Sequence, residues 1–165
     1  MSDNEKIVEL EKPGRSTFEN YCNKNNHIVN YRFTTGKTGL DAVIQTDDFR
    51  NIGVEIKYRR FNYDKYPTLI FEKMKQDVFD RRYKKYSKLD IKSNIHYDDI
   101  LYVNVFEDGS MIMYNYSNIL DKINNGEYKT EISYMNYATF KDNTKSAKEV
   151  YYLKISDGIY VKTCA

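Results

Sequence analysis

The sequence is poor in the residues that most often break, cross-link or anchor a chain. Its 165 residues include two prolines, seven glycines, two cysteines and no tryptophan. Cys22 and Cys164 lie near opposite ends, at no metal-ligand or disulfide-framework spacing, so we expect free thiols in a reducing compartment. No apolar run approaches the roughly 20 residues that a membrane helix needs, and the charged start MSDNEKIVELEKPG is unlike a signal peptide. We therefore expect a cytoplasmic protein with no membrane association.

The sequence also lacks a charge excess. Lys and Arg number 26 against 24 Asp and Glu, a formal net charge of +2, so charge alone does not indicate a nucleic-acid partner. What is abundant is tyrosine, with 17 Tyr beside 8 Phe. Tyrosine suits half-buried strands and can also stack on bases. A hydrophobic content of 41% and the length predict one globular domain spanning residues 1–165.

The first half of the chain predicts a helix followed by three strands. Residues 1–13 are expected to form a loose N-terminal leader without regular structure, which ends at Pro13-Gly14. Ser16 to Glu19 has the form of a capping box, which predicts a helix over Thr17–Lys24. Strands are then expected at Ile28–Thr34, Leu40–Gln45 and Ile52–Arg59.

The second half predicts another helix and two hairpins. The segment Tyr66–Glu72 could begin a helix at Pro67 or form a short extended piece. A helix over Glu72–Tyr86 follows, with Met74 and Val78 on its inner face. The remaining predictions are a hairpin of Asp99–Phe106 and Met111–Tyr116, a helix Ser117–Asn124 capped by Ser117, irregular strand over Gly126–Ser146, and a hairpin of Glu149–Ile155 and Ile159–Thr163. This order is that of a mixed α/β (α+β) fold.

Two carboxylates and a lysine stand out in the strand region. Glu55 and Lys57 are two apart and leave the same face of their strand, whereas Val54 and Ile56 leave the other and can join the core. Asp41 precedes Glu55 by 14 residues on the preceding strand, and a short turn would let the two strands pair antiparallel. Charged groups are costly on a merely buried face, but two carboxylates suit a hard cation such as Mg²⁺.

These residues resemble a known family. Leu40-Asp41 followed by Glu55-Ile56-Lys57 is similar to the signature of the PD-(D/E)XK nuclease superfamily, although Leu40 stands where the name of the family has proline. The resemblance covers roughly residues 16–86 and includes the order of helix, strands and helix. It implies a restriction endonuclease-like core, a central mixed β-sheet flanked by helices, here with C-terminal β-hairpins added.

The resemblance also implies roles for particular residues. Asp41 and Glu55 would ligate Mg²⁺ or Mn²⁺ with the help of the Ile56 carbonyl, and Lys57 would position the attacking water. Glu19 matches a helix position where many members carry an additional acidic residue. The implied activity is metal-dependent endonuclease hydrolysis of phosphodiester bonds, in DNA by preference with RNA not excluded, and a homodimer is plausible because many members cut two strands.

Basic and aromatic residues lie near this signature. Interleaved cations and aromatics can contact phosphates and stack on bases. The candidate nucleic-acid-binding residues are Tyr58, Arg59, Arg60, Lys73, Lys75, Arg81 and Arg82, and the second basic run continues through Lys84, Lys85 and Lys88.

Other interpretations remain open. Glu55 and Lys57 could form a solvated strand face with Asp41 as a cross-strand partner. Glu19 could be only the capping-box glutamate, and polar residues of the second helix, Glu72 and Lys75, could face solvent or the site. A non-catalytic nucleic-acid-binding module and a phage or host interaction protein with a tyrosine-rich surface are the alternative functions.

Overall fold

The computed structural model describes residues 3–34, 39–83, 96–136 and 145–163. Its largest element is a six-stranded sheet with the order β1-β2-β3-β5-β6-β9. Strands β3 and β5 are parallel and every other neighbouring pair in this sheet is antiparallel. The strands are β1 (Ile28–Phe33), β2 (Ala42–Thr46), β3 (Asn51–Arg59), β5 (Asp99–Phe106), β6 (Ser110–Asn115) and β9 (Ile159–Lys162).

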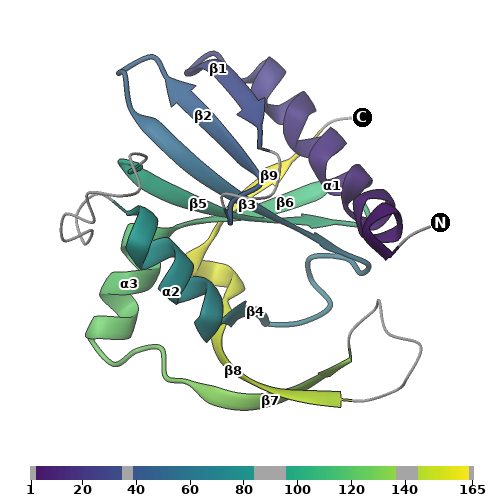
Figure 1. The fold of residues 1–165 in the computed structure, drawn as a ribbon, viewed down its shortest axis with the longest axis vertical. Helices are drawn as coiled ribbons and strands as arrows, with labels where there is room; N and C mark the ends of the chain where they lie inside the picture. Colours follow the sequence, from purple (N-terminus) through teal and green to yellow (C-terminus); the bar gives the residue numbers. More distant parts are fainter. Residues whose placement is uncertain (1–2, 35–38, 84–95, 137–144, 164–165) are drawn as a thin grey trace.

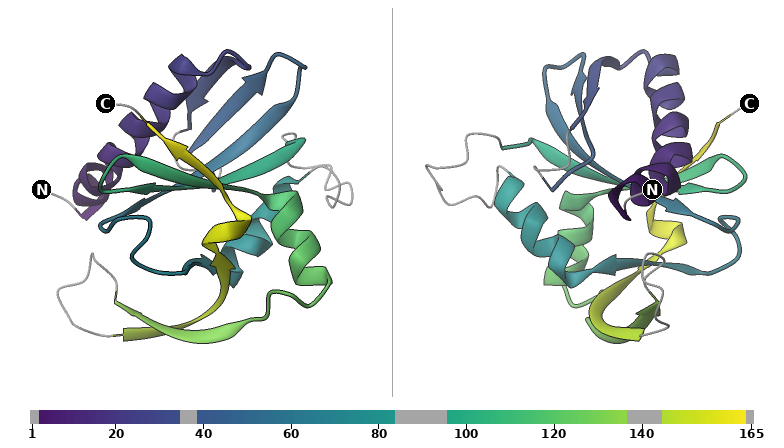
Figure 2. Two further views of the ribbon diagram at one scale, coloured as in Figure 1. Left: turned by 180° about the vertical axis from the view of Figure 1, so that it is seen from behind. Right: turned by 45° about the vertical axis from the view of Figure 1, so that its right-hand side comes forward.

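A second, three-stranded antiparallel sheet has the order β4-β8-β7. It consists of β4 (Thr68–Glu72), β8 (Lys145–Lys154) and β7 (Glu131–Asn136), and it lies below the large sheet in Figure 1. Helices α2 (Lys73–Arg82) and α3 (Tyr116–Asn124) lie between the two sheets, whereas α1 (Asp3–Lys24) covers the opposite face of the large sheet (Figures 1 and 2). The fold is therefore a mixed α/β arrangement with a central mixed sheet flanked by helices, as expected. No helix in these described ranges is long and apolar enough to cross a membrane.

Two apolar clusters fill the layers. On the α1 side, Phe18 and Cys22 pack with Val54 and Ile56 of β3, so the predicted core role of these two β3 residues is confirmed. On the other side, a larger cluster rich in aromatic residues joins the sheet to α2, α3 and the small sheet. Strands β5 and β6 are buried almost throughout, as continuous apolar strands between two covered faces should be.

The first helix corrects the predicted N-terminal region. Helix α1 begins at Asp3, so residues 3–13 are not a loose leader, and Ser16 to Glu19 is not a capping box because it lies inside the helix. Pro13 is also inside the helix, although it cannot donate the usual backbone hydrogen bond. Close packing on the sheet holds the helix there: a side chain at Gly14 would come within 3.3 Å of the Tyr58 Cβ atom.

The C-terminal strands correct a second prediction. The hairpin of Asp99–Phe106 and Met111–Tyr116 is present as β5 and β6, but β8 and β9 do not form a hairpin. A short 3-10 helix, Ile155–Asp157, separates them, so β8 pairs with β4 and β7 while β9 pairs with β6 in the large sheet. Strand β7 occupies part of Gly126–Ser146, where only irregular strand was expected.

The middle helices differ from the predictions in detail. The ambiguous segment Tyr66–Glu72 provides strand β4, and α2 ends at Arg82, so the predicted continuation beyond residue 83 lies outside the described ranges. Met74 is exposed, with 63% of its surface accessible, and the inner face is instead formed by Gln76 and Phe79 with half-buried Val78. Ser117 does not cap α3 as predicted, because it lies inside the helix. Asp99 of β5 caps it instead: its carboxylate accepts hydrogen bonds from the Ser117 N–H and hydroxyl.

Candidate active site

The pairing of β2 with β3 places Asp41 beside Glu55. The two strands are antiparallel with Ala42 opposite Val54, and the Asp41 N–H extends this ladder by donating to the Val54 carbonyl at 2.8 Å. One step further, the Ile56 N–H donates to the Asp41 Oδ2 atom at 2.8 Å. The carboxylate of Asp41 therefore takes the position of the next backbone acceptor, next to Glu55 on β3.

Glu55 is a buried carboxylate held by two lysines. Its side chain is 3% exposed, and its Oε1 atom lies 3.0 Å from Lys57 Nζ and 2.6 Å from Lys75 Nζ. A buried charge of this kind is tolerated only when it is paired. Lys57 comes from the same strand face and Lys75 from α2, so the packing of α2 on the sheet completes the pairing.

Lys57 is protonated in this environment. Burial opposes its charged form, but the attraction of Glu55, with a smaller contribution from Tyr102, outweighs burial and raises the pKa of Lys57 above its usual value. At neutral pH the side chain is therefore an ammonium group. It can donate hydrogen bonds and stabilise negative charge, but it does not act as a base in this form.

For Asp41, in contrast to Lys57, the surroundings disfavour the charged form. Burial and the nearby Glu55 carboxylate raise the pKa of Asp41, while the Ile56 N–H, Lys57 and Arg15 lower it by smaller amounts. Arg15 Nη2 lies 3.3 Å from Asp41 Oδ1. The balance leaves the ionised form of Asp41 disfavoured, which indicates a place where additional positive charge would be stabilising.

Helix α1 contributes two residues that the sequence analysis did not single out. Arg15 contacts Asp41, and Glu11, one turn earlier, lies 3.6 Å from Arg15 through its Oε2 atom. Burial and then Asp41 raise the pKa of Glu11, and Lys57 and Glu55 also act on it. We call Glu11, Asp41 and Glu55 the acidic cluster. The sequence does contain a signal for the longer helix, a spacing of four residues through Leu10, Gly14, Phe18 and Cys22. Pro13-Gly14 favoured a helix that starts only after it.

Glu19 lies outside this cluster. It is exposed on α1, and its Oε1 atom accepts a hydrogen bond from the Tyr31 hydroxyl at 3.2 Å. It is eight residues beyond Glu11, about 12 Å along the helix axis. Glu19 is therefore apart from Asp41 and Glu55, whereas Glu11 is the acidic residue of α1 on which their charges act.

The predicted nucleic-acid-binding residues divide into three groups. Lys75 reaches the acidic cluster, and Arg60, Arg81 and Arg82 are at least partly exposed. Tyr58 packs toward α1, and the Lys73 ammonium donates a hydrogen bond to the Gln76 side chain. Glu72, which the sequence placed either in solvent or in the site, pairs with Lys148 instead of entering the site. The part of the second basic run at Lys84, Lys85 and Lys88 lies outside the described ranges.

Arg59 is engaged inside the fold. Its guanidinium donates to Asn104 Oδ1 at 2.9 Å, to the Ile70 carbonyl at 3.1 Å and to the Tyr102 hydroxyl at 3.0 Å. These bonds join β3 to β4 and β5. Arg59 is therefore a structural link between the two sheets, and its donors are not directed toward a bound phosphate.

The cluster offers oxygen ligands suited to a hard cation. The carboxylates of Asp41 and Glu55 are adjacent, and the Ile56 carbonyl leaves β3 on the same side as its N–H, toward Asp41, because both groups of one strand residue point to the same neighbour. Among the residues whose side chains are described, no group of three or more His, Cys, Asp or Glu is arranged to hold a metal ion.

Comparisons with family models, with curated proteins and with solved structures find no match to this chain.

Proposed function

We propose that this protein is a Mg²⁺-dependent deoxyribonuclease with an active site at Asp41, Glu55 and Lys57, in a core of the restriction endonuclease-like type. The observation that carries the proposal is the adjacent pair of confined carboxylates, Asp41 and Glu55, with a protonated lysine two residues along the same strand face. The order of helix, strands and helix around this pair supports it, as does the additional acidic residue on the first helix, Glu11.

Two carboxylates and a backbone carbonyl are the kind of oxygen donors that Mg²⁺ takes. Asp41, Glu55 and the Ile56 carbonyl would hold the ion, with Glu11 close enough to act on the same charge balance. Burial, and after it the charge of Glu55, raises the pKa of Asp41, and a divalent cation bound by both carboxylates would offset both effects. When bound, Mg²⁺ would lower the pKa of a coordinated water and neutralise charge that develops on the phosphate.

The lysines supply what remains of the chemistry. The Lys57 ammonium would orient the attacking water by donating a hydrogen bond, and it would stabilise the negative charge on the phosphate oxygens. Lys75 now shares Glu55 Oε1 with Lys57. If Glu55 turns to a metal ion, Lys75 is released toward the phosphate from α2, which would hold the DNA backbone beside the metal.

The test is cleavage of plasmid DNA and of single-stranded and branched DNA with Mg²⁺ or Mn²⁺. Wild-type protein should cut, EDTA should abolish cutting, and Asp41→Asn should lower the rate by at least roughly a hundredfold, in the range for loss of one strong electrostatic group at an active site. Asp48→Asn, a change of the same kind in the exposed β2–β3 turn, is the matched control and should cut like wild type.

A second candidate is a non-catalytic nucleic-acid-binding module, and one observation favours it. Arg15, Lys57 and Lys75 already pair with the carboxylates, so the cluster is neutralised without a metal ion. This candidate predicts DNA binding that persists in EDTA and falls steeply with salt, with no cleavage under any divalent ion. The same panel therefore separates the two functions.

A further inference from the structure

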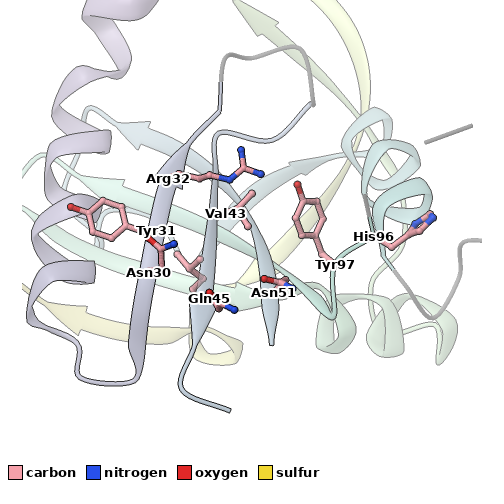
Figure 3. A pocket seen from close by; sticks show the side chains of 9 residues that line it. Asn30, Tyr31, Arg32, Val43, Gln45, Asn51, His96 and Tyr97 are labelled. Carbon is pink, nitrogen blue, oxygen red and sulfur yellow. The ribbon is translucent and has the colours of Figure 1, made fainter. Parts of the chain in front are cut away.

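A polar groove lies on the face of the large sheet that α1 leaves uncovered, on strands β1, β2 and β3. It has a volume of about 400 Å³, within the range of small-ligand sites. Its lining includes Asn30, Arg32, Val43, Gln45, Asn51 and Tyr97 (Figure 3), and we call it the amide groove.

The strand register produces a row of three carboxamides. Asn30 of β1 is opposite Gln45 of β2, and Gln45 is opposite Asn51 of β3. The alternating residues Tyr31 and Ile44 join the core on the α1 side, so the carboxamide row belongs to the other face. Three neighbouring amide groups on three paired strands offer donors and acceptors for the edge of a flat polar ligand.

Tyr97 forms the wall of the groove, and the structure fixes it in place. A side chain at Gly53 would come within 2.9 Å of the Tyr97 ring, so glycine at this position lets the ring lie against β3. The Tyr97 N–H donates to the Arg82 carbonyl at 2.8 Å, and the next residue, Asp98, exchanges hydrogen bonds of 2.8 Å with the backbone of Asn51. The wall is therefore bonded both to the end of α2 and to the start of β3.

The groove carries a guanidinium group. Within the described ranges, the Arg32 guanidinium forms no hydrogen bond or ion pair, and Figure 3 shows it extending across Val43 toward Tyr97. Arg82 also acts on Tyr97: burial raises the pKa of the Tyr97 hydroxyl, and Arg82 and Arg32 oppose that rise. The neighbouring carboxylate of Asp98 already accepts the Asn51 N–H.

The groove lies on two of the strands that carry the active site. Asn51 and Gln45, which line it, are each four residues from Glu55 and Asp41 respectively, or roughly 13 Å along their strands, and the side chains of Tyr97 and Leu40 cover Gly53 between them. Carboxamides and guanidinium groups recognise the edges of bases, and an aromatic wall suits a base or sugar. The unpaired cation suits a phosphate.

We propose that the amide groove binds one nucleotide of the DNA strand that is cut at Asp41 and Glu55, to one side of the cleaved bond. This inference rests on the proposed nuclease function. In this arrangement Gln45 and its neighbouring amides contact the base, Tyr97 packs against it, and Arg32 contacts its phosphate. The groove then determines which nucleotide is preferred beside the cleavage position, while the metal site performs the cleavage.

Binding in EDTA tests the groove separately from cleavage. A labelled short single-stranded DNA is titrated with wild-type protein, Gln45→Ala, Arg32→Ala and the control Lys129→Ala, which removes an exposed cation between α3 and β7. We expect Gln45→Ala and Arg32→Ala to weaken binding by roughly fivefold or more, as loss of a base or phosphate contact does. Lys129→Ala should change it by less than about twofold. The loss with Gln45→Ala should be the same at low and high salt, because the removed group is uncharged.

The outcomes are distinguishable. The groove proposal is overturned if Gln45→Ala and Arg32→Ala, with unchanged melting temperatures, bind DNA as Lys129→Ala does. Tighter binding of the RNA oligonucleotide of the same sequence would overturn the assignment to DNA. If groove variants lose binding but the wild-type protein cuts nothing with Mg²⁺, the groove is supported as a nucleotide site and the nuclease function fails.

Discussion

At the scale of single residues, the acidic cluster buries two of its carboxylates in places that disfavour their ionised forms. Glu55 is paired twice with lysine, whereas Asp41 and Glu11 both have raised pKa values because they are buried near other carboxylates. Sites evolved for folding alone rarely keep such repulsion, and functional sites often do. Two predictions follow from the individual charges.

Replacing Asp41 by Asn should stabilise the metal-free protein at neutral pH. A carboxyl whose pKa is raised on folding contributes stability below its ordinary value of 3.8, and that contribution is lost as pH rises through the raised value. Asp41→Asn removes this loss. We expect its melting temperature to exceed that of wild type by about 3 °C at neutral pH, for a change of about 1 kcal/mol, and the difference to shrink toward pH 4. Thermal unfolding across this pH range checks it; a difference that grows on acidification would contradict the assignment.

Glu11 and Glu19 provide a matched pair on one helix. Glu11→Gln should reduce Mg²⁺-dependent cleavage by roughly tenfold or more, because Glu11 acts on the charge balance at Asp41 and Glu55. Glu19→Gln makes the same chemical change about two turns away and should leave cleavage unchanged. Steady-state cleavage rates of the two variants, measured at equal protein concentration, decide between the positions. Equal losses of cleavage rate in both variants would contradict a role for Glu11 in the charge balance of the site.

At the scale of elements, strand positions were predictable and strand partners were less so. The strands that carry Asp41 and Glu55 have clear alternation and a short turn between them, so their antiparallel pairing followed from local sequence. The C-terminal strands also alternate around Ser156-Asp157-Gly158, yet β8 and β9 enter different sheets. The sheet that each of these two strands joins depends on non-local contacts. Gly158, between them, packs so closely against Ile112 and Tyr114 that a side chain there would overlap both.

The first helix shows the same limitation in another form. Pro13-Gly14 predicts a break from local propensity, but the tight approach of Gly14 to β3 lets tertiary packing override it. That misjudged boundary is why Glu11 and Arg15 were not anticipated. The candidate site was thus predictable where it lies on paired strands, and it was incomplete where another element packs over it.

Arg59 and Arg60 test the distinction between a link in the fold and a surface cation. Arg59→Met removes three hydrogen bonds that join β3, β4 and β5, so it should destabilise the protein by about 2–4 kcal/mol, or roughly 6–12 °C in melting temperature. Arg60→Met alters the next, exposed residue and should shift stability by less than about 0.5 kcal/mol. Thermal denaturation of both variants gives the answer; comparable stability would mean that the Arg59 bonds contribute little.

At the scale of the whole molecule, we expect the fold not to depend on a metal ion. Two apolar clusters on the two sides of the large sheet hold the layers together, and the acidic cluster lies at the start of β2, outside both of them. The protein should therefore remain folded in EDTA. A Mg²⁺ concentration ten times the dissociation constant should add about 1.4 kcal/mol of stability, roughly 3–5 °C, and Asp41→Asn should abolish this gain. Thermal shifts with and without Mg²⁺ test this, and an equal shift in wild type and variant would place the ion elsewhere.

We propose that Asp41, Glu55 and Lys57 form one catalytic site, and a substitution of Lys57 tests this most directly. Lys57→Ala leaves the proposed metal ligands in place and removes the group that would orient water and stabilise charge. We predict that calorimetry will show Mn²⁺ binding to Lys57→Ala with an affinity similar to that of wild type, while single-turnover DNA cleavage falls by roughly a hundredfold or more. Wild-type protein that is folded but neither binds a divalent ion nor cuts DNA, or a Lys57→Ala variant that cuts as fast as wild type, would contradict the account.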